Sequence, residues 1–210
     1  MPQHPLIGHF LSLCRDRTTP MPQFRAAMAE LGRWLTYETC RDWLPTAEAT
    51  IETPLDVQLT ARRLDLSQPI AIVPILRAAL ALTEGCMPLL PNARVYHVGY
   101  RRDEATAQAH CYMSGVPERL SSNERFLLPE PMLATGGTLV QLMQELTARG
   151  ADAGKIRVVS VIASRPALQR IGAAYPSLHI TCAAVDDELD ERYYIVPGLG
   201  DAGDRAFGTE

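Results

Sequence analysis

A short segment with two adjacent glycines, Thr135-Gly136-Gly137-Thr138, has the residue types of an anion-binding loop. Glycine can adopt positive φ angles, which lets consecutive backbone N–H groups converge on one anion, and the two threonine hydroxyls add donors. A helix predicted to follow the loop adds the partial positive charge of its amino terminus. The segment therefore predicts a phosphate site. A plain Gly-Gly turn with Thr138 as helix N-cap explains the same residues, so the assignment needs support from other motifs.

The basic residues indicate which phosphate chemistry is excluded. A nucleoside triphosphatase P-loop ends in Gly-Lys-Ser/Thr, whereas the only lysine of this chain, Lys155, lies beyond the predicted helix. All other basic residues are arginines, whose planar and always protonated forks suit phosphate groups. Arg77 directly follows an apolar strand segment, where a ligand-binding side chain is expected. Arg77 as a surface residue at a helix start is the alternative.

A second glycine motif lies near the carboxyl terminus, where residues 198–203 match G-x-G-x-x-G letter for letter. A dinucleotide fingerprint needs a following helix, a strand and an acidic residue about 20 residues further on. Only seven residues follow Gly203, so we reject dinucleotide binding. We expect this glycine-rich backbone to lie close to a planar ligand instead.

The overall composition is that of one ordinary globular domain. The chain has 210 residues, 47% of them hydrophobic, with 20 basic and 24 acidic side chains and a formal charge of −4. Such a composition excludes a disordered chain, and the acidic sum argues against a surface that attracts nucleic acid as a whole. The five cysteines form no C-x-x-C pair, so neither a disulfide framework nor a zinc site is predicted. For the acidic run 186–191 we favour a solvated loop over a metal site.

The amino-terminal and most apolar segments predict a soluble cytoplasmic protein. The first residues, MPQHPLIGHFLSL, lack the basic start of a signal peptide. The most apolar stretch, residues 70–90, is interrupted by Pro74, Arg77, Glu84 and Pro88, which a membrane span would not tolerate.

The elements that must position these motifs alternate between strands and helices. After a helix over 22–44 and short strands within 49–60, strands are predicted at 70–73, 94–98, 125–128, 156–162 and 179–185, and helices at 77–86, 139–149 and 166–175. This alternation predicts a parallel, right-handed α/β sheet. Ligands bind such sheets beyond the carboxyl ends of the strands, where Arg77 and the glycine loop fall. The longest loop, 103–124, lacks periodicity and is either a functional lid or irregular.

Taken together, three segments resemble the uracil phosphoribosyltransferase family. They are VPILRAAL at 73–80, EPMLATGGT at 130–138 and YIVPGLGDAGDRAFGT at 194–209, with looser similarity at 4–6 and 35–38. The resemblance covers nearly the whole chain and implies the type I phosphoribosyltransferase fold, a Rossmann-like parallel sheet flanked by helices. It implies a single domain with an amino-terminal helical arm or cap (1–68), a core sheet (69–185) and a uracil-binding hood (186–210).

The resemblance also implies an activity and a set of residues. Ribose 5-phosphate would pass from 5-phosphoribosyl 1-pyrophosphate (PRPP) to uracil in pyrimidine salvage, giving UMP and pyrophosphate, with Mg²⁺ held mainly through PRPP and not by protein ligands. Arg77, Arg102, Glu130 and Asp201 would form the catalytic set. The sequence leaves open whether Arg101 takes the place of Arg102 or whether both are solvated. PRPP would contact Arg77, Arg102, Glu130, Met132, Ala134, Thr135, Gly136, Gly137, Thr138 and Asp201; uracil would contact Ile195, Gly200, Asp201 and Ala202.

The residue chemistry agrees with this activity. Displacement at an anomeric carbon passes through an oxocarbenium-like state and needs no protein nucleophile, and the sequence shows no nucleophile motif. Arginines and Mg²⁺ can stabilise the departing pyrophosphate. Backbone groups at 195–202 can match the N–H of uracil between its two carbonyls and would mismatch cytosine.

Two positions depart from the family pattern. Glu130 replaces the usual aspartate, and one extra carbon moves the carboxylate by about 1.5 Å, a displacement of the order that costs roughly 100-fold in rate when uncompensated. Gly115 stands where a lysine is expected in the long loop. We therefore expect a functional enzyme and leave open whether its turnover is reduced.

Two alternatives remain at this point. The first is a catalytically weak phosphoribosyltransferase-fold regulator that binds nucleotide or RNA, against which the acidic total charge argues. The second is transfer to a base other than uracil. We also expect a homodimer or higher homo-oligomer and no nucleic-acid or membrane partner. The resemblance permits a GTP effector, which the sequence leaves open.

Overall fold

The protein is built on a parallel sheet whose strand order differs from the chain order. The structure is a computed structural model that describes residues 1–102 and 109–209, with only the backbone of Arg102 and Ala109. The sheet runs β11 (His179–Asp186), β10 (Ile156–Ser164), β8 (Arg125–Pro129), β3 (Ile70–Ile72) and β5 (Arg94–Val95), and β9 (Met132–Leu133) pairs with the end of β10. All of these pairings are parallel, as the alternation of strands and helices predicted.

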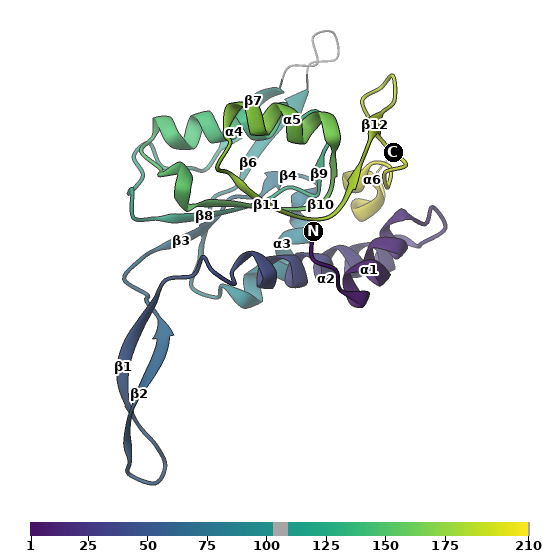
Figure 1. Cartoon of the computed structure of the whole chain (residues 1–210). Coiled ribbons are helices and arrows are strands. Elements are labelled where there is room, and N and C mark those ends of the chain that lie inside the picture. Colours follow the sequence, from purple (N-terminus) through teal and green to yellow (C-terminus); the bar gives the residue numbers. More distant parts are fainter. Residues whose placement is uncertain (103–108, 210) are drawn as a thin grey trace.

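Helices cover both faces of this sheet (Figure 1). One face carries α4 (Gly137–Ala148) and α5 (Arg165–Ala174), and the other carries α1 (Pro5–Arg15), α2 (Met21–Thr39) and α3 (Ala79–Cys86), with short 3₁₀ turns at Met87–Leu89 and Ala153–Lys155. In α2 the predicted apolar stripe of Phe24, Met28, Leu31 and Leu35 is fully buried. The α1 helix was not predicted. The predicted helix over 22–44 ends at Thr39, because Trp43 turns inward and donates to the carbonyl of Lys155.

A second, three-stranded sheet corrects two sequence predictions. It consists of β4 (Ile75–Leu76), β6 (Val98–Arg102) and β7 (Ala109–Ser114), with β6 and β7 antiparallel. The strand predicted over 94–98 is therefore two strands in two sheets, β5 and β6. The segment 103–124, predicted as a loop that is either a functional lid or irregular, contains β7. This strand is formed by pairing with β6 and not by an apolar sequence pattern. Residues 103–108 of that prediction lie outside the described chain.

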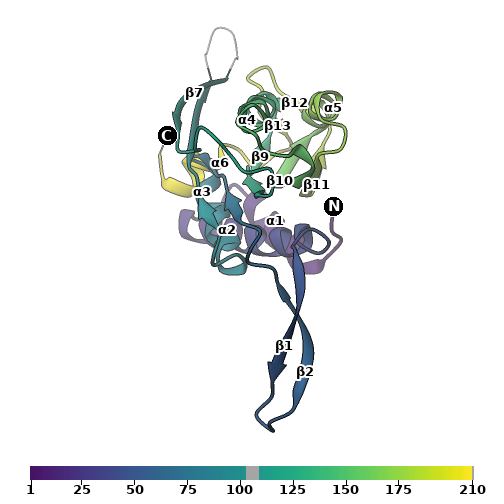
Figure 2. The same ribbon diagram turned by 90° about the vertical axis from the view of Figure 1, so that its left-hand side faces the viewer.

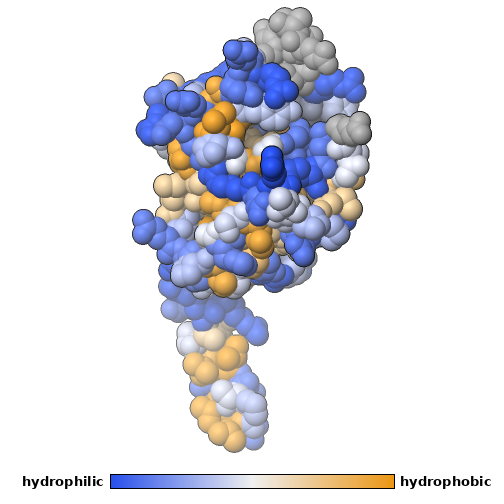
Figure 3. Space-filling model, turned by 90° about the vertical axis from the view of Figure 1, so that its right-hand side faces the viewer, coloured by the Kyte–Doolittle hydropathy of each residue, from blue (hydrophilic) through white to orange (hydrophobic). Residues whose placement is uncertain are grey.

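A hairpin of β1 (Thr46–Glu52) and β2 (Gln58–Leu64) projects away from the sheet (Figures 1 and 2). Short strands were predicted here over 49–60, and the observed register is longer, from Thr46 opposite Leu64 to Glu52 opposite Gln58. Apolar residues gather at the far end of the hairpin (Figure 3), where Leu55, Val57 and Leu59 are exposed.

The carboxyl-terminal segment forms a small hairpin of β12 (Glu188–Leu189) and β13 (Ile195–Val196), followed by α6 (Ala202–Phe207). Within the described residues, three or more metal-ligating side chains do not cluster anywhere, the acidic run 186–191 included. No helix in the described ranges is long and apolar enough to cross a membrane. The division into arm, core and hood stays a prediction, although α2 packs directly on β10 and β11.

Candidate active site

The glycine loop joins β9 to α4 in a conformation that requires glycine. Gly136 is the N-cap of α4 and has a φ of +70°. A Cβ atom at this position would lie 3.0 Å from Cγ1 of Ile171 and 3.1 Å from the carbonyl oxygen of Ala167, so backbone and side chain both exclude a larger residue. The alternative with Thr138 as N-cap is wrong, because the N-cap is Gly136, two residues earlier, and Thr138 instead lines the main cavity.

The loop is fastened to the neighbouring helix by Ser164, which the sequence did not single out. Its hydroxyl donates to the carbonyl of Ala134 and accepts the N–H of Ala167 at 3.0 Å, capping α5. Ser164 is fully buried at the end of β10. The amino terminus of α5 is thereby held beside the amino terminus of α4, with the loop between them.

The main cavity, of about 810 Å³, lies at the carboxyl ends of the strands. Seven charged or hydroxyl side chains line it from several segments, namely Arg77, Tyr100, Arg101, Tyr112, Glu130, Thr138 and Asp201. Both carboxylates and both arginines therefore face one space, which is the composition needed for a phosphorylated sugar and its leaving group.

Three of the predicted residues have distinct settings. Arg77 is 57% exposed and ion-paired with Asp204 at 3.3 Å, which leaves its fork accessible from the cavity. Glu130 follows β8, and its backbone N–H donates to the carbonyl of Val159 at 2.9 Å. The preceding Pro129 is the last residue of β8; it is buried and is paired with Val159 of the adjacent strand β10. Arg102 ends β6 and its side chain is outside the described structure, whereas Arg101 lines the cavity.

A second cavity of about 370 Å³ adjoins the first. Tyr193, Tyr194 and Ile195 line it together with Arg192 and Ala134. Met132 and Asp201 line both cavities, so the two spaces share a wall.

This second cavity brings together residues predicted for different ligands. Ile195 was assigned to the base, Ala134 to PRPP and Asp201 to both. Ala202 is buried as the first residue of α6, and Gly200 has a φ of +77°; neither of these predicted base contacts lines the cavity. The sequence prediction missed Tyr112 of β7 in the main cavity, and Arg192, Tyr193 and Tyr194 in the second. The adjacent tyrosines before the terminal motif were the available signal.

An ion pair between the two ends of the chain holds the loop before Gly200. Arg15 of α1 meets Asp186 at the end of β11 with N–O distances of 2.6 and 2.9 Å. The Gly198 N–H donates to Asp186 at 3.0 Å, and the Gly198 carbonyl accepts from Arg15 at 2.9 Å. Burial raises the pKa of Asp186, but these hydrogen bonds and the Arg15 charge outweigh it, so the pKa of this carboxyl lies below its usual value.

The fold is the one that type I phosphoribosyltransferases share. A hypoxanthine phosphoribosyltransferase from Staphylococcus aureus shares the fold at a TM-score of 0.50 and 12% identity, over 83% of this chain and 85% of that one. The AQ2163 protein from Aquifex aeolicus is much more similar, with a TM-score of 0.87 and 36% identity over 98% of this chain and 96% of that one.

Sequence comparison narrows the class to a family. The uracil phosphoribosyltransferase family model matches residues 1–209. A uracil phosphoribosyltransferase of Synechococcus elongatus is 53% identical, over 100% of this chain and 96% of the relative. A chloroplastic one from Arabidopsis thaliana is 46% identical, over 100% of this chain and 71% of the relative. The chain belongs to the uracil phosphoribosyltransferase family, as the sequence motifs predicted, and is a phosphoribosyl-transferring enzyme of pyrimidine salvage.

Proposed function

We propose that this protein transfers the 5-phosphoribosyl group of PRPP to uracil, giving UMP and pyrophosphate. The observation that carries the proposal is the shared wall of the two cavities, to which Met132 and Asp201 contribute. A sugar phosphate in the larger space and a planar base in the smaller would meet at this wall. Holding both reactants in contact supplies much of the rate enhancement for a displacement that needs no protein nucleophile.

The glycine loop and the arginines would bind different phosphate groups of PRPP. The N–H groups at the start of α4 and the Thr138 hydroxyl would hold the 5-phosphate. At the other end, Arg77 with Arg101 or Arg102 would neutralise the departing pyrophosphate, on which negative charge grows in the transition state. Glu130 would accept hydrogen bonds from the ribose hydroxyls.

The residues of the main cavity fit a Mg²⁺ ion that arrives with PRPP. Glu130 and Asp201 face this space, and the described residues hold no larger cluster of metal-ligating side chains. Protein sites commonly bind Mg²⁺ through one or two carboxylates together with substrate phosphates. When bound, the ion supplies positive charge to the pyrophosphate; the carboxylates orient the ribose.

A panel of bases tests the proposal. Purified protein with PRPP and Mg²⁺ should convert uracil to UMP, with cytosine, hypoxanthine and adenine inert, because only uracil presents an N–H between two carbonyls to the backbone near Ile195. Faster turnover of another base would overturn the assignment of uracil. Reactions with and without GTP show whether it is an effector. Failure to turn over any base, with salt-dependent retention of RNA, would favour the regulatory alternative.

We predict that Glu130→Asp preserves or raises kcat. The shorter side chain restores the carboxylate position of the family pattern, and the backbone at residue 130 is fixed by its bond to Val159. Steady-state kinetics with PRPP and uracil measure this, and Glu130→Gln, which keeps the length but removes the charge, is the matched control and should lose most activity. A large loss in Glu130→Asp would show that this backbone is adapted to glutamate.

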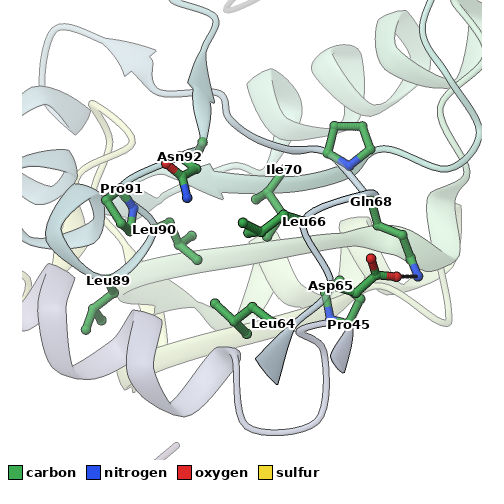
Figure 4. Close-up of a pocket in the computed structure, with 12 residues that line it drawn as sticks. Pro45, Leu64, Asp65, Leu66, Gln68, Ile70, Leu89, Leu90, Pro91 and Asn92 are labelled. Carbon is green, nitrogen blue, oxygen red and sulfur yellow. Dashed lines mark hydrogen bonds between the residues drawn. The ribbon is translucent and has the colours of Figure 1, made fainter. Parts of the chain in front are cut away.

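We propose that the protein self-associates through the projecting hairpin. Leu55 is 84% exposed and Leu66, at the hairpin base, 71% exposed. An apolar cavity of about 260 Å³ lies at that base, lined by Leu64, Leu66, Ile70 and Leu90 among others (Figure 4). Such exposed apolar area on an arm, next to an apolar cavity, favours a second copy as the partner.

We predict that Leu55→Glu combined with Leu59→Glu lowers the oligomeric mass, because charges would enter an apolar contact. Light scattering after gel filtration measures the mass. The control is Gln58→Glu, a substitution of one exposed polar residue of the same strand, which should leave the mass unchanged. An unchanged mass in the double variant would contradict association through the hairpin.

A further inference from the structure

One arginine outside the motifs lies against the glycine loop. Arg170 is on α5, and a Cβ atom at Gly137 would lie 3.3 Å from its Nη1 atom and 3.6 Å from its Cζ atom. The same point is 3.6 Å from the Thr135 hydroxyl oxygen. The Arg170 guanidinium and the Thr135 hydroxyl therefore lie on the same side of Gly137, the first residue of α4.

The position of Arg170 follows from the packing of α5. Ala167 and Ile171, on the same helix face, are buried, and both lie so close to Gly136 that no Cβ atom fits between the helix and the loop. Helices α4 and α5 run side by side on one face of the sheet (Figures 1 and 2). Arg170 is thus carried by an element already fastened to the loop through Ser164.

The charge of Arg170 is not engaged by an acid. Within the described residues, its guanidinium makes neither an ion pair nor a hydrogen bond, and the side chain is exposed. Arg165 of the same helix differs, because its Nε donates to Asp187 at 2.9 Å. An arginine fork that lies beside Gly137 and has no carboxylate partner among the described residues is placed to bind an anion.

We propose that Arg170 is an additional phosphate-binding residue of the glycine loop, which contacts the terminal phosphate monoester of the sugar substrate and of the nucleotide product. The inference rests on the proposed function, in that it takes the loop to be the 5-phosphate site. Arg170 would close the side of the loop that faces α5, whereas Thr138 lines the main cavity. Its contribution concerns affinity for the monoester and not the displacement itself.

The test compares ligands with and without the phosphate. We expect Arg170→Gln to weaken binding of UMP and of ribose 5-phosphate by about tenfold, since a charge-assisted hydrogen bond is lost. Binding of uridine, which lacks the phosphate, should be unchanged. The KM for PRPP should rise by a similar factor, with kcat and the KM for uracil within about twofold. Calorimetry supplies the affinities, and Arg170→Lys should retain part of them.

The matched control is Arg165→Gln, which removes the same charge from the same helix but from a residue paired with Asp187. This control should leave UMP affinity within about twofold. It thereby distinguishes a direct contact between Arg170 and the phosphate from the long-range electrostatic effect of any positive charge on α5. Equal UMP affinity in Arg170→Gln and wild type would overturn the proposal, as would an equal loss in Arg165→Gln. Binding of ribose 5-phosphate tests Arg170 even if no base is turned over, so a failure of the proposed function is distinguishable.

Discussion

Replacing Gly136 with valine is expected to lower kcat/KM for PRPP by about 100-fold or more, an effect of the size seen when a phosphate-orienting group is displaced. Gly136 has a φ of +70°, which a β-branched residue does not tolerate. Its Cβ would also press on Ile171 and on the Ala167 carbonyl. The loop must therefore move, and the N–H groups at the start of α4 would no longer converge. Steady-state kinetics at varied PRPP measure the effect.

The control for this variant is Gly172→Val. Gly172 lies on α5, one residue beyond Ile171, and a Cβ there meets no atom within 4 Å. This control should therefore keep kcat/KM within about twofold, since exposed substitutions away from special conformations have small effects. UMP affinity in the Gly136 variant should fall while uridine affinity is retained. Full activity in Gly136→Val would show that the loop does not hold the phosphate.

The largest loss of stability is expected for Arg15→Leu, which removes the partner of a buried carboxylate. Asp186 is only 7% exposed, and its hydrogen-bonded pair with Arg15 joins α1 to β11. Leaving one charge of a buried pair uncompensated costs about 3–5 kcal/mol of unfolding free energy. Urea denaturation at neutral pH measures the change. The double variant Arg15→Leu with Asp186→Leu should recover most of the loss.

The stability difference should also depend on pH. The pKa of Asp186 in the folded wild type lies below its usual value, so its contribution to stability is fully present above that usual value, about 3.9, and is lost as the pH falls through the lowered pKa. In Arg15→Leu the unpaired carboxyl gains stability from protonation, so the difference between the two proteins narrows in acid. A difference that stays constant from pH 7 down to about pH 2 would contradict this account.

Sequence reasoning predicted best where local pattern and tertiary structure agree. The buried strands β8 and β10 and the helices that follow them have short apolar runs with clear end signals, and these placed Glu130 and the glycine loop at the carboxyl edge of the sheet. Arg77 was placed beside them by the same rule. The strand β7 escaped prediction because its order depends on pairing with β6, which no local pattern encodes.

The residues that complete the site were harder to predict for a related reason. Arg15 and Asp186 are 171 positions apart, and neither belongs to a recognisable motif. Arg170 sits in an ordinary amphipathic helix, and only the packing of Ile171 on Gly136 reveals what it faces. Which of Arg101 and Arg102 would contact pyrophosphate depends on which face of β6 each side chain occupies. These features arise from three-dimensional packing between distant segments.

Hydrogen bonds between the two ends of the chain make the carboxyl-terminal segment part of the folded core. Arg205 donates to the carbonyls of Leu199 and Asp16 at 2.7 and 2.6 Å, and Arg25 donates to Ala206 at 2.8 Å. A chain that stops short of Ile195 lacks walls of both cavities and also leaves α1 and α2 without the helix they cover. Such a shortened chain exposes the apolar surface on which Ala202 and Ala206 are buried and lacks Asp201, which lines both cavities.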